Sequence, residues 1–173
     1  PITLNLQQPI FLTVSALTLR DGGETSKNVE ATIHAVAKLK QGSLLLLGTG
    51  SDADRIDKLA SHMLPATRYK RLVVSHNTIQ QYYQAADVFT LASSASEAFG
   101  LVYLEALACN LPIVTIDDNL RRAIIGPAGV FIKDPNNIDD YSSGLKQALQ
   151  TNWDNLPRNQ AQKYSWDNTI KLY

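Results

Sequence analysis

Short apolar runs alternate with helical patterns from one end of this 173-residue chain to the other. The runs are typical of strands buried on both faces, and they lie at residues 10–14, 44–47, 72–74, 87–91, 112–116 and 130–132. Between the first two, Val29, Ile33, Val36 and Ala37 follow the i, i+4, i+7, i+8 spacing of a helix with one apolar face. Buried strands separated by helices predict an α/β fold with a doubly wound, parallel, Rossmann-like sheet and right-handed crossovers.

Further helices are expected at about 52–62, 78–85, 100–109, 138–150 and 160–172. No repeat, low-complexity tract or linker interrupts the pattern. We therefore predict a single domain over residues 1–173, in which residues 153–173 form a closing C-terminal segment with the last helix. Trp153 and Trp166 are expected to pack this segment against the rest of the domain.

The charges balance, with 16 basic and 16 acidic residues, so no global field recruits nucleic acid or an anionic membrane. Cys109 is the only cysteine, which excludes an internal disulfide and favours a reducing compartment. The cysteine and the three histidines share no metal-ligand spacing, so we expect no metal site. No run approaches the roughly 20 apolar residues of a membrane span. We expect a cytoplasmic protein, and the absence of an initiator Met suggests an excised piece of a longer one.

In an open α/β sheet, ligands bind outside the carboxyl ends of the strands. The segments that follow the predicted strands are 17–26, 48–50, 75–77, 93–100 and 117–122. The unusual residues of the chain fall in these segments or directly after them.

Glu97 and Glu105 are two acids in an otherwise apolar stretch. In a helix from about Gly100 to Cys109, Glu105 shares a face with leucines and an alanine, and the composition predicts an interior helix. A buried carboxylate costs several kcal/mol unless it is paired or faces a polar cleft. Glu97 precedes the helix, whose free N–H groups also suit a phosphate. A satisfied core acid beside an ordinary acidic residue at a helix start is an equally good interpretation of this segment alone.

Lys27 is expected in the first turn of a helix, where the dipole disfavours a cation by some tenths of a kcal/mol. A bound anion would reverse that penalty, and a solvated lysine is the alternative. Gly48 and Gly50 would let a ligand approach the backbone, although a tight turn into the next helix explains them too. His76, at a strand end, is a candidate base or ring-stacking group. The charged residues of segment 117–122 are most simply a solvated rim, from which one Arg could reach a phosphate or a partner domain.

The run from Glu97 through Phe99, Gly100 and Leu101 to Glu105, continuing to residue 114, resembles the E-x7-E signature of the family 4 retaining glycosyltransferases, also called group 1. The resemblance covers nearly the whole chain. The other matching positions are the first-strand end at 14–17, the lysine at 27–28, the glycine turn at 48–50, the strand at 86–89 and the segment at 129–135.

The resemblance implies one half of a GT-B enzyme of carbohydrate biosynthesis, in which two Rossmann-like domains face each other. This chain would be the C-terminal, donor-binding half, and the acceptor-binding N-terminal domain is absent from it. The partners implied are a nucleoside diphosphate sugar and that second domain, which would also provide any contact with the inner membrane face. No metal or other cofactor is implied. Alone, such a domain would bind donor without turning it over.

By the same resemblance, Glu97 contacts hydroxyls of the donor sugar and Glu105 holds the ribose of the nucleotide. Lys27 neutralises the diphosphate, together with backbone amides at Phe99, Gly100 and Leu101. Sugar transfer with retention of configuration to an unknown acceptor is the activity implied.

The chain departs from the family pattern at several positions. Ala16 stands where the family usually has an Arg that is paired with the Lys, and Arg20 in the same loop is the candidate substitute. The segment around His76 is short and lacks the family's glycine, and Asn110 replaces a glycine after the signature helix. Because the expected Arg is missing, two alternatives stay open: a non-catalytic nucleotide-sugar-binding or interaction domain, and a GT-B epimerase.

Overall fold

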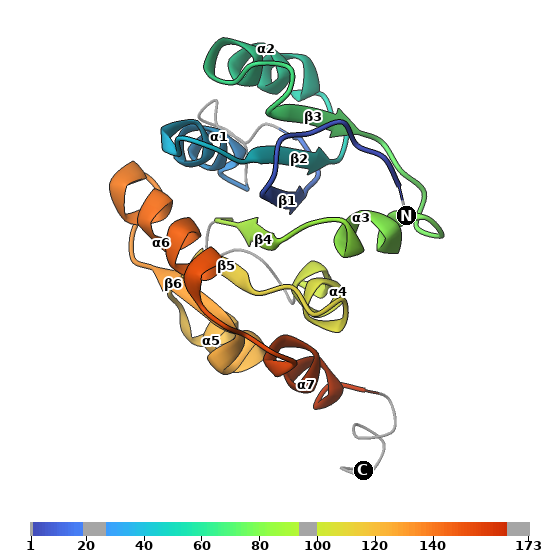
Figure 1. Ribbon diagram of the computed structural model, residues 1–173, viewed down its shortest axis with the longest axis vertical. Helices are drawn as coiled ribbons and strands as arrows, with labels where there is room; N and C mark the ends of the chain where they lie inside the picture. The colour runs from blue at the N-terminus through green and yellow to red at the C-terminus, as the bar shows by residue number, and fades with distance from the viewer. Residues whose placement is uncertain (1, 19–26, 94–99, 166–173) are drawn as a thin grey trace.

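A computed structural model describes residues 2–18, 27–93 and 100–165 of the chain (Figure 1). Its centre is a six-stranded parallel sheet with the strand order β3-β2-β1-β4-β5-β6. The strands are β1 (Ile10–Val14), β2 (Ser43–Leu47), β3 (Tyr69–Leu72), β4 (Val88–Leu91), β5 (Ile113–Ile116) and β6 (Gly129–Ile132). The predicted doubly wound Rossmann-like sheet is thus confirmed, and the chain reverses its direction of progress across the sheet between β1 and β4.

Helices cover both faces of the sheet (Figure 1). The helices are α1 (Val29–Lys38), α2 (Ala53–Met63), α3 (Ile79–Gln84), α4 (Leu101–Ala108), α5 (Asn119–Ile125), α6 (Ile138–Gln150) and α7 (Leu156–Gln162), with a short 3-10 turn, η1 (Gly126–Ala128). Helices α1, α2 and α6 contribute to one buried apolar cluster, whereas α3, α4, α5 and α7 contribute to the other.

The pleat of the strands divides the core between these two clusters. In β1, Phe11 packs into the first cluster, while Ile10 and Leu12 pack into the second. Alternation follows because successive side chains of a strand point to opposite faces. The continuous apolar runs of the sequence are therefore explained by a sheet that is covered on both sides.

Strand β3 differs from its prediction. It lies at Tyr69–Leu72 instead of 72–74, its residues are only half-buried, and Val73 beyond it is 67% exposed. The strand is at the edge of the sheet, so it pairs only with β2 and needs less apolar surface. Arg71 and Tyr69 donate hydrogen bonds to Asp57 of α2, at 2.7 Å for both Arg71 Nη2 and the Tyr69 hydroxyl.

Two helices near the C-terminal end also differ from the prediction. Helix α5 lies where no helix was predicted, and the Asp118 carboxylate caps it by accepting the N–H of Arg121 at 2.8 Å. Helix α7 begins at Leu156 and ends at Gln162, whereas a helix over 160–172 was expected, of which residues 166–172 lie outside the described residues. Pro157 suits a helix start, because its missing N–H has no partner in the first turn anyway. Trp153 packs on the core as expected, and Trp166 lies outside the described residues.

Helix α4 forms where it was predicted, but the expectation that it is interior is wrong. Its buried residues are Tyr103, Ala106 and Leu107. Leu101 is 64% exposed, and Glu105, on the same side, is half-buried. The apolar residues all round the helix concealed its orientation, because periodicity marks a buried face only against a polar one. Glu105 is therefore an acid at the surface of the helix layer, not one in the core.

Candidate functional site

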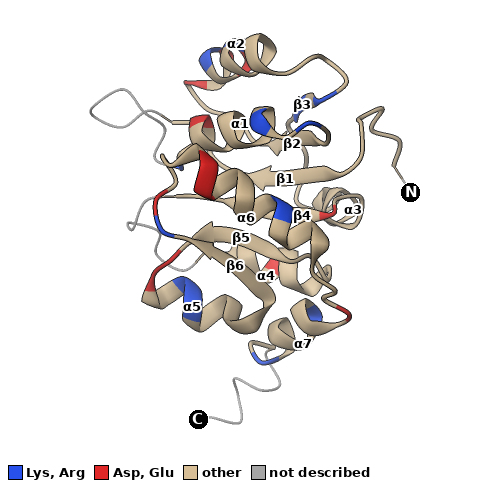
Figure 2. Cartoon of the chain, turned by 60° about the vertical axis from the view of Figure 1, so that its left-hand side comes forward, with Lys and Arg blue, Asp and Glu red and all other residues tan. Residues whose placement is uncertain are grey.

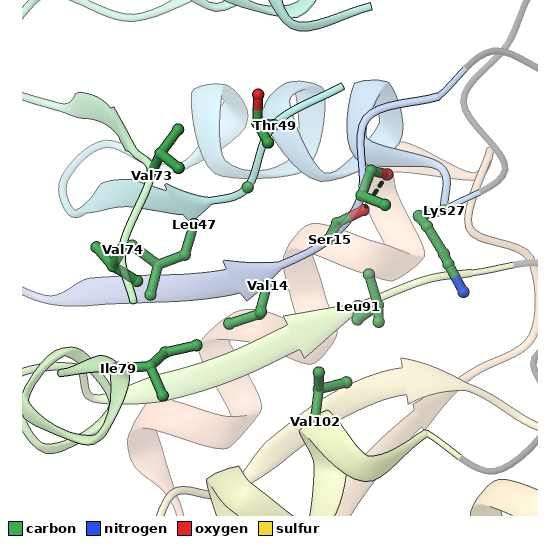
Figure 3. Close-up of a pocket in the computed structure, with 12 residues that line it drawn as sticks. Val14, Ser15, Lys27, Leu47, Thr49, Val73, Val74, Ile79, Leu91 and Val102 are labelled. Atoms are coloured by element: carbon green, nitrogen blue, oxygen red, sulfur yellow. Dashed lines mark hydrogen bonds between the residues drawn. The ribbon is translucent and has the colours of Figure 1, made fainter. Parts of the chain in front are cut away.

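A cavity of about 400 Å³ opens at the carboxyl ends of β1, β2 and β4 (Figure 3). Val14, Leu47 and Leu91 at the ends of these strands form its floor, and residues of α3 and α4 complete the wall. The site is the point where the strand order reverses, which is where open α/β sheets bind their ligands. The fold therefore creates this cavity independently of any motif.

Lys27 lines the cavity just before α1 (Figure 3). Among the described lining residues it is the only one with a cationic side chain. The N-cap of α1 is Asn28, in the left-handed conformation with φ of 50°, and its side chain does not cap the helix. Ala16, at the position of the family's usual Arg, lines the same cavity. A single lysine thus supplies the positive side-chain charge of the described wall.

The glycines of the turn after β2 are explained by backbone packing. A Cβ on Gly48 would lie 1.8 Å from the Ser15 carbonyl oxygen, and one on Gly50 would lie 2.0 Å from that of Leu17. The Leu17 N–H donates to the Thr49 carbonyl at 3.0 Å, which fastens the segment after β1 to this turn. Gly48 also lines the cavity, so a donor contact there stays a prediction, whereas the close approach already requires both glycines.

Helix α4 starts at the same cavity. Gly100 is its N-cap, in the left-handed conformation with φ of 66°, and Val102 of the first turn lines the cavity. A Cβ on Gly100 would come within 2.5 Å of the Tyr103 ring, so only glycine fits. Glycine brings no side chain to cap the first turn. Because Val102 of the first turn lines the cavity, the positive end of the helix dipole lies at the cavity wall.

Glu105 and His76 lie on a neighbouring pocket of about 270 Å³. Tyr83 and Cys109 also line this pocket, and Ile79 lines both pockets. The Tyr83 hydroxyl donates a hydrogen bond to Glu105 Oε2 at 2.7 Å. Burial and this hydrogen bond raise the pKa of Tyr83 far above its ordinary value, so the hydroxyl keeps its proton. Sequence reasoning missed Tyr83, although its i, i+4 spacing from Ile79 marks it as a core tyrosine whose hydroxyl needs a partner.

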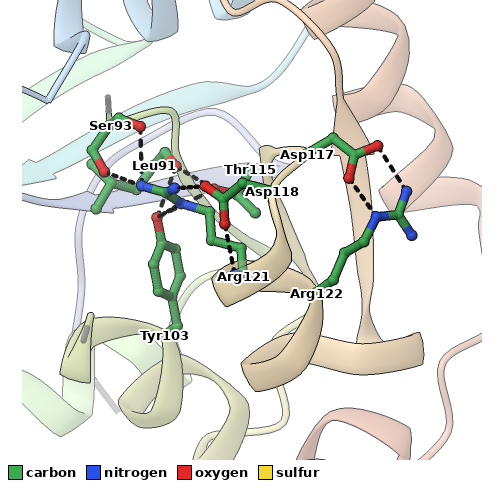
Figure 4. Close-up of polar contacts among 8 residues, drawn as sticks. All are labelled: Leu91, Ser93, Tyr103, Thr115, Asp117, Asp118, Arg121 and Arg122. Atoms are coloured by element: carbon green, nitrogen blue, oxygen red, sulfur yellow. Dashed lines mark hydrogen bonds and ion pairs between the residues drawn. The ribbon is translucent and has the colours of Figure 1, made fainter. Parts of the chain in front are cut away.

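Arg121 contradicts the expectation that the charges of segment 117–122 form a solvated rim (Figure 4). It is 1% exposed, and its guanidinium forms an ion pair with Asp118. It also donates to the Tyr103 hydroxyl at 3.1 Å and to the Ser93 hydroxyl at 2.6 Å. Arg121 thus joins α5, α4 and the segment that follows β4.

Arg122 points the other way from α5 and is paired with Asp117 (Figure 4). Its guanidinium also lies 4.8 Å from the centre of the Phe131 ring. Both arginines of the segment are therefore engaged within the domain. The described charges as a whole are spread over many elements of the fold (Figure 2).

The structure brings only some of the predicted site residues together. Lys27 and Gly48 share the larger pocket, and His76 and Glu105 share the smaller one. Leu101, at the start of α4, presents an exposed side chain, and only its backbone remains a candidate contact. Glu97, Phe99 and Arg20 lie outside the described residues.

The described residues hold no cluster of three or more His, Cys, Asp or Glu suited to a metal ion. No helix within 2–18, 27–93 or 100–165 has the length and apolar character needed to cross a membrane.

The fold and the cavity define a Rossmann-like α/β domain with a candidate ligand site at the carboxyl edge of its sheet, and comparison with known proteins identifies its family. The family described as glycosyl transferases group 1 matches residues 2–165. The chain belongs to this family, and its fold is the Rossmann-like half of the GT-B arrangement.

Sequence relatives match only part of their own length. An uncharacterised glycosyltransferase of Methanocaldococcus jannaschii is 29% identical over 84% of this chain and 40% of its own. Alpha-monoglucosyldiacylglycerol synthase of Acholeplasma laidlawii is 35% identical over 69% of this chain and 30% of its own. This chain therefore spans less than half the length of these relatives.

Solved structures share the fold at lower identity. Sucrose-phosphate synthase from Thermosynechococcus elongatus superimposes with a TM-score of 0.79 at 24% identity, covering 95% of this chain and 43% of that one. The pneumococcal O-GlcNAc transferase GtfA, in complex with UDP and GlcNAc, superimposes with a TM-score of 0.76 at 18% identity, covering 96% of this chain and 36% of that one.

Proposed function

We propose that this chain is the donor-binding domain of a retaining glycosyltransferase. It binds a nucleoside diphosphate sugar, and the sugar passes with retention of configuration to an acceptor that a facing N-terminal domain holds. The isolated chain is then a binding domain without turnover, because transfer needs both sides of the cleft to close on the reactants.

The observation that carries this proposal is the position of Lys27 in the cavity at the strand-order reversal, opposite the start of α4. A lysine and a helix N-terminus on one cavity are suited to a diphosphate. The remaining described wall is largely apolar, which suits the uncharged parts of a nucleotide.

Under this proposal Lys27 neutralises the diphosphate, assisted by the backbone amides of Phe99, Gly100 and Leu101. Glu105 binds the ribose, and Glu97 binds hydroxyls of the donor sugar. His76 lies beside the base, since it lines the same pocket as Glu105. Arg20 is the candidate for a second cation at the diphosphate.

The chemistry follows from where charge develops. The leaving nucleoside diphosphate gains negative charge in the transition state. Lys27 and the positive end of the α4 dipole would stabilise that charge without a metal. Glu97, beside the sugar, would lend charge to the developing oxocarbenium ion.

A second candidate is a nucleotide-sugar-binding domain that does not catalyse transfer. The cavity favours it in one respect, because Ala16 lines the position where the family has an Arg. Assay of the full-length protein separates the two: binding of the donor with neither transfer nor hydrolysis would favour the non-catalytic candidate.

Titration calorimetry with UDP, GDP and ADP sugars tests the donor site. We expect one nucleotide class to bind, and Lys27→Ala and Glu105→Ala each to weaken it roughly 10- to 100-fold, as for loss of a charge-assisted hydrogen bond. UDP sugars come first, since the similar pneumococcal enzyme structure holds UDP.

The matched control is Lys58→Ala, which removes an exposed lysine from α2. It should bind as the wild-type chain does. No heat with any nucleotide sugar would remove the donor-site proposal.

A further inference from the structure

Tyr83 holds its hydroxyl in a fixed place. The residue is 1% exposed, and its ring packs beside Phe89 with 5.9 Å between the ring centres. Phe89 is itself fully buried in β4. The ring cannot change its position without disturbing the core. The phenolic hydroxyl is therefore held at the edge of the core, beside the Glu105 carboxylate.

Glu105 by itself would not be fixed. It is half-buried on the outer side of α4, where a glutamate can adopt several rotamers. The Tyr83 O–H donates to Oε2 at 2.7 Å and so selects one orientation of the carboxylate. A phenol has a single proton, and it is engaged here. Oε1 and the second lone pair of Oε2 remain able to accept hydrogen bonds from a ligand.

The 270 Å³ pocket on which both residues lie shows where such a ligand would be. A carboxylate that is fixed with two adjacent acceptor oxygens matches two adjacent hydroxyl donors, the geometry of a vicinal diol. A mobile carboxylate would instead adjust to a single hydroxyl, and water would satisfy its other oxygen.

We propose that Tyr83 is a positioning residue that orients Glu105 toward a vicinal diol, so that the site selects ribonucleotides over 2′-deoxyribonucleotides. This inference rests on the proposed donor site. Selectivity arises because the deoxy ligand leaves one oriented acceptor without a donor, and such a loss is costly only where the site is preorganised.

Calorimetric titration of the chain with UDP, GDP and ADP, and with their 2′-deoxy counterparts, tests the inference. For the nucleotide class that binds, we expect the wild-type chain to prefer the ribonucleotide roughly 10- to 100-fold, the range for one hydrogen bond to a charged group. Tyr83→Phe should lower the affinity for the ribonucleotide by about fivefold or more, while changing the affinity for the deoxy ligand by no more than about twofold. The preference therefore falls.

Three further variants separate positioning from packing. Tyr82→Phe removes a hydroxyl from the neighbouring residue, one that is not bonded to Glu105, and should leave the preference unchanged. Glu105→Asp shortens the carboxylate away from the Tyr83 hydroxyl without touching the core, and should lower the preference as Tyr83→Phe does. Glu105→Gln and Tyr83→Phe together should weaken binding no more than Glu105→Gln alone, because the two residues act through one contact.

An unchanged preference in Tyr83→Phe would overturn the inference, as would equal weakening of the ribo and deoxy ligands, which is the result of a purely structural role. Should Tyr83→Phe fail to fold, an unchanged preference in Glu105→Asp would overturn it as well. If the wild-type chain binds none of the nucleotides, the donor site fails and the role of Tyr83 fails with it. Loss of the preference alone, with binding retained, is the result that supports Tyr83.

Discussion

Arg121 and Arg122 are adjacent and carry the same charge, yet one is buried and the other is exposed. Sequence could not separate them, because a seven-residue helix has too few turns for its periodicity to show which side faces the core. Tyr83 escaped prediction for a related reason. Its place in the core follows from spacing, but its partner Glu105 is 22 residues away and is brought near only by the packing of α3 against α4.

The difference between the two arginines is measurable as stability. Arg121→Ala leaves the carboxylate of Asp118 and the hydroxyl of Ser93 without their buried partner, and we expect a loss of about 3 kcal/mol or more in the free energy of unfolding. Arg122→Ala, the matched control, removes an exposed ion pair and should cost much less. Urea unfolding checks both, and equal losses would show that the burial of Arg121 does not matter to stability.

Among the helices and strands, the sequence correctly predicted the bounds of those whose apolar residues are clearly separated from polar ones. Helix α6 was predicted with its observed bounds, Ile138–Gln150, because its polar and apolar faces are distinct. Strand β1 was predicted for the same residues that form it, since its apolar run ends at polar neighbours. The face of α4 and the bounds of β3 were wrong, because the first is apolar all round and the second is an edge strand with a mixed composition.

A chain of buried hydroxyls ties α6 to the sheet and to α1. The Tyr141 hydroxyl lies 2.9 Å from Thr32 Oγ1 and 2.6 Å from Thr90 Oγ1, and Thr13 Oγ1 donates to the Thr90 carbonyl at 2.7 Å. Burial raises the pKa of Tyr141 from its ordinary value of 10 to about 12. Burial therefore favours the protonated Tyr141 hydroxyl in the folded chain, where it contacts α1 and β4.

Tyr141 makes stability fall at alkaline pH. Its raised folded pKa means that the unfolded chain loses this proton first, so its contribution is complete below pH 10 and is lost as the pH rises through 12. Two pKa units correspond to about 3 kcal/mol. Urea unfolding between pH 8 and 12 should show a shallower alkaline fall in Tyr141→Phe. The stability of the variant should still fall with pH, because the pKa values of Tyr69 and Tyr83 are also raised.

The control for this pH series is Tyr164→Phe, which removes a hydroxyl from an exposed tyrosine. It should keep the wild-type slope. The same slope in Tyr141→Phe and the wild-type chain would contradict the raised pKa of Tyr141 in the folded chain.

At the scale of the whole molecule, the topology determines where a ligand can bind. The larger of the two pockets lies at the carboxyl ends of β1 and β4, where the strand order reverses. Its described wall includes Lys27 and the start of α4. Sequence could indicate this edge, because parallel strands bring their carboxyl ends together. The sequence could not predict that the candidate residues lie on two pockets. Glu105 and His76 line an adjoining pocket, whose wall depends on the packing of α3 against α4.

A nucleoside diphosphate sugar is proposed to bind at this edge of the sheet. Mapping of amide chemical shifts in the ¹⁵N-labelled chain, titrated with UDP, GDP and ADP sugars, tests it most directly. We predict that the largest shifts lie at Lys27, Gly48, Gly100 and Glu105. Shifts confined to the opposite end of the sheet, around Lys40 and Lys146, or none with any of these ligands, would contradict it.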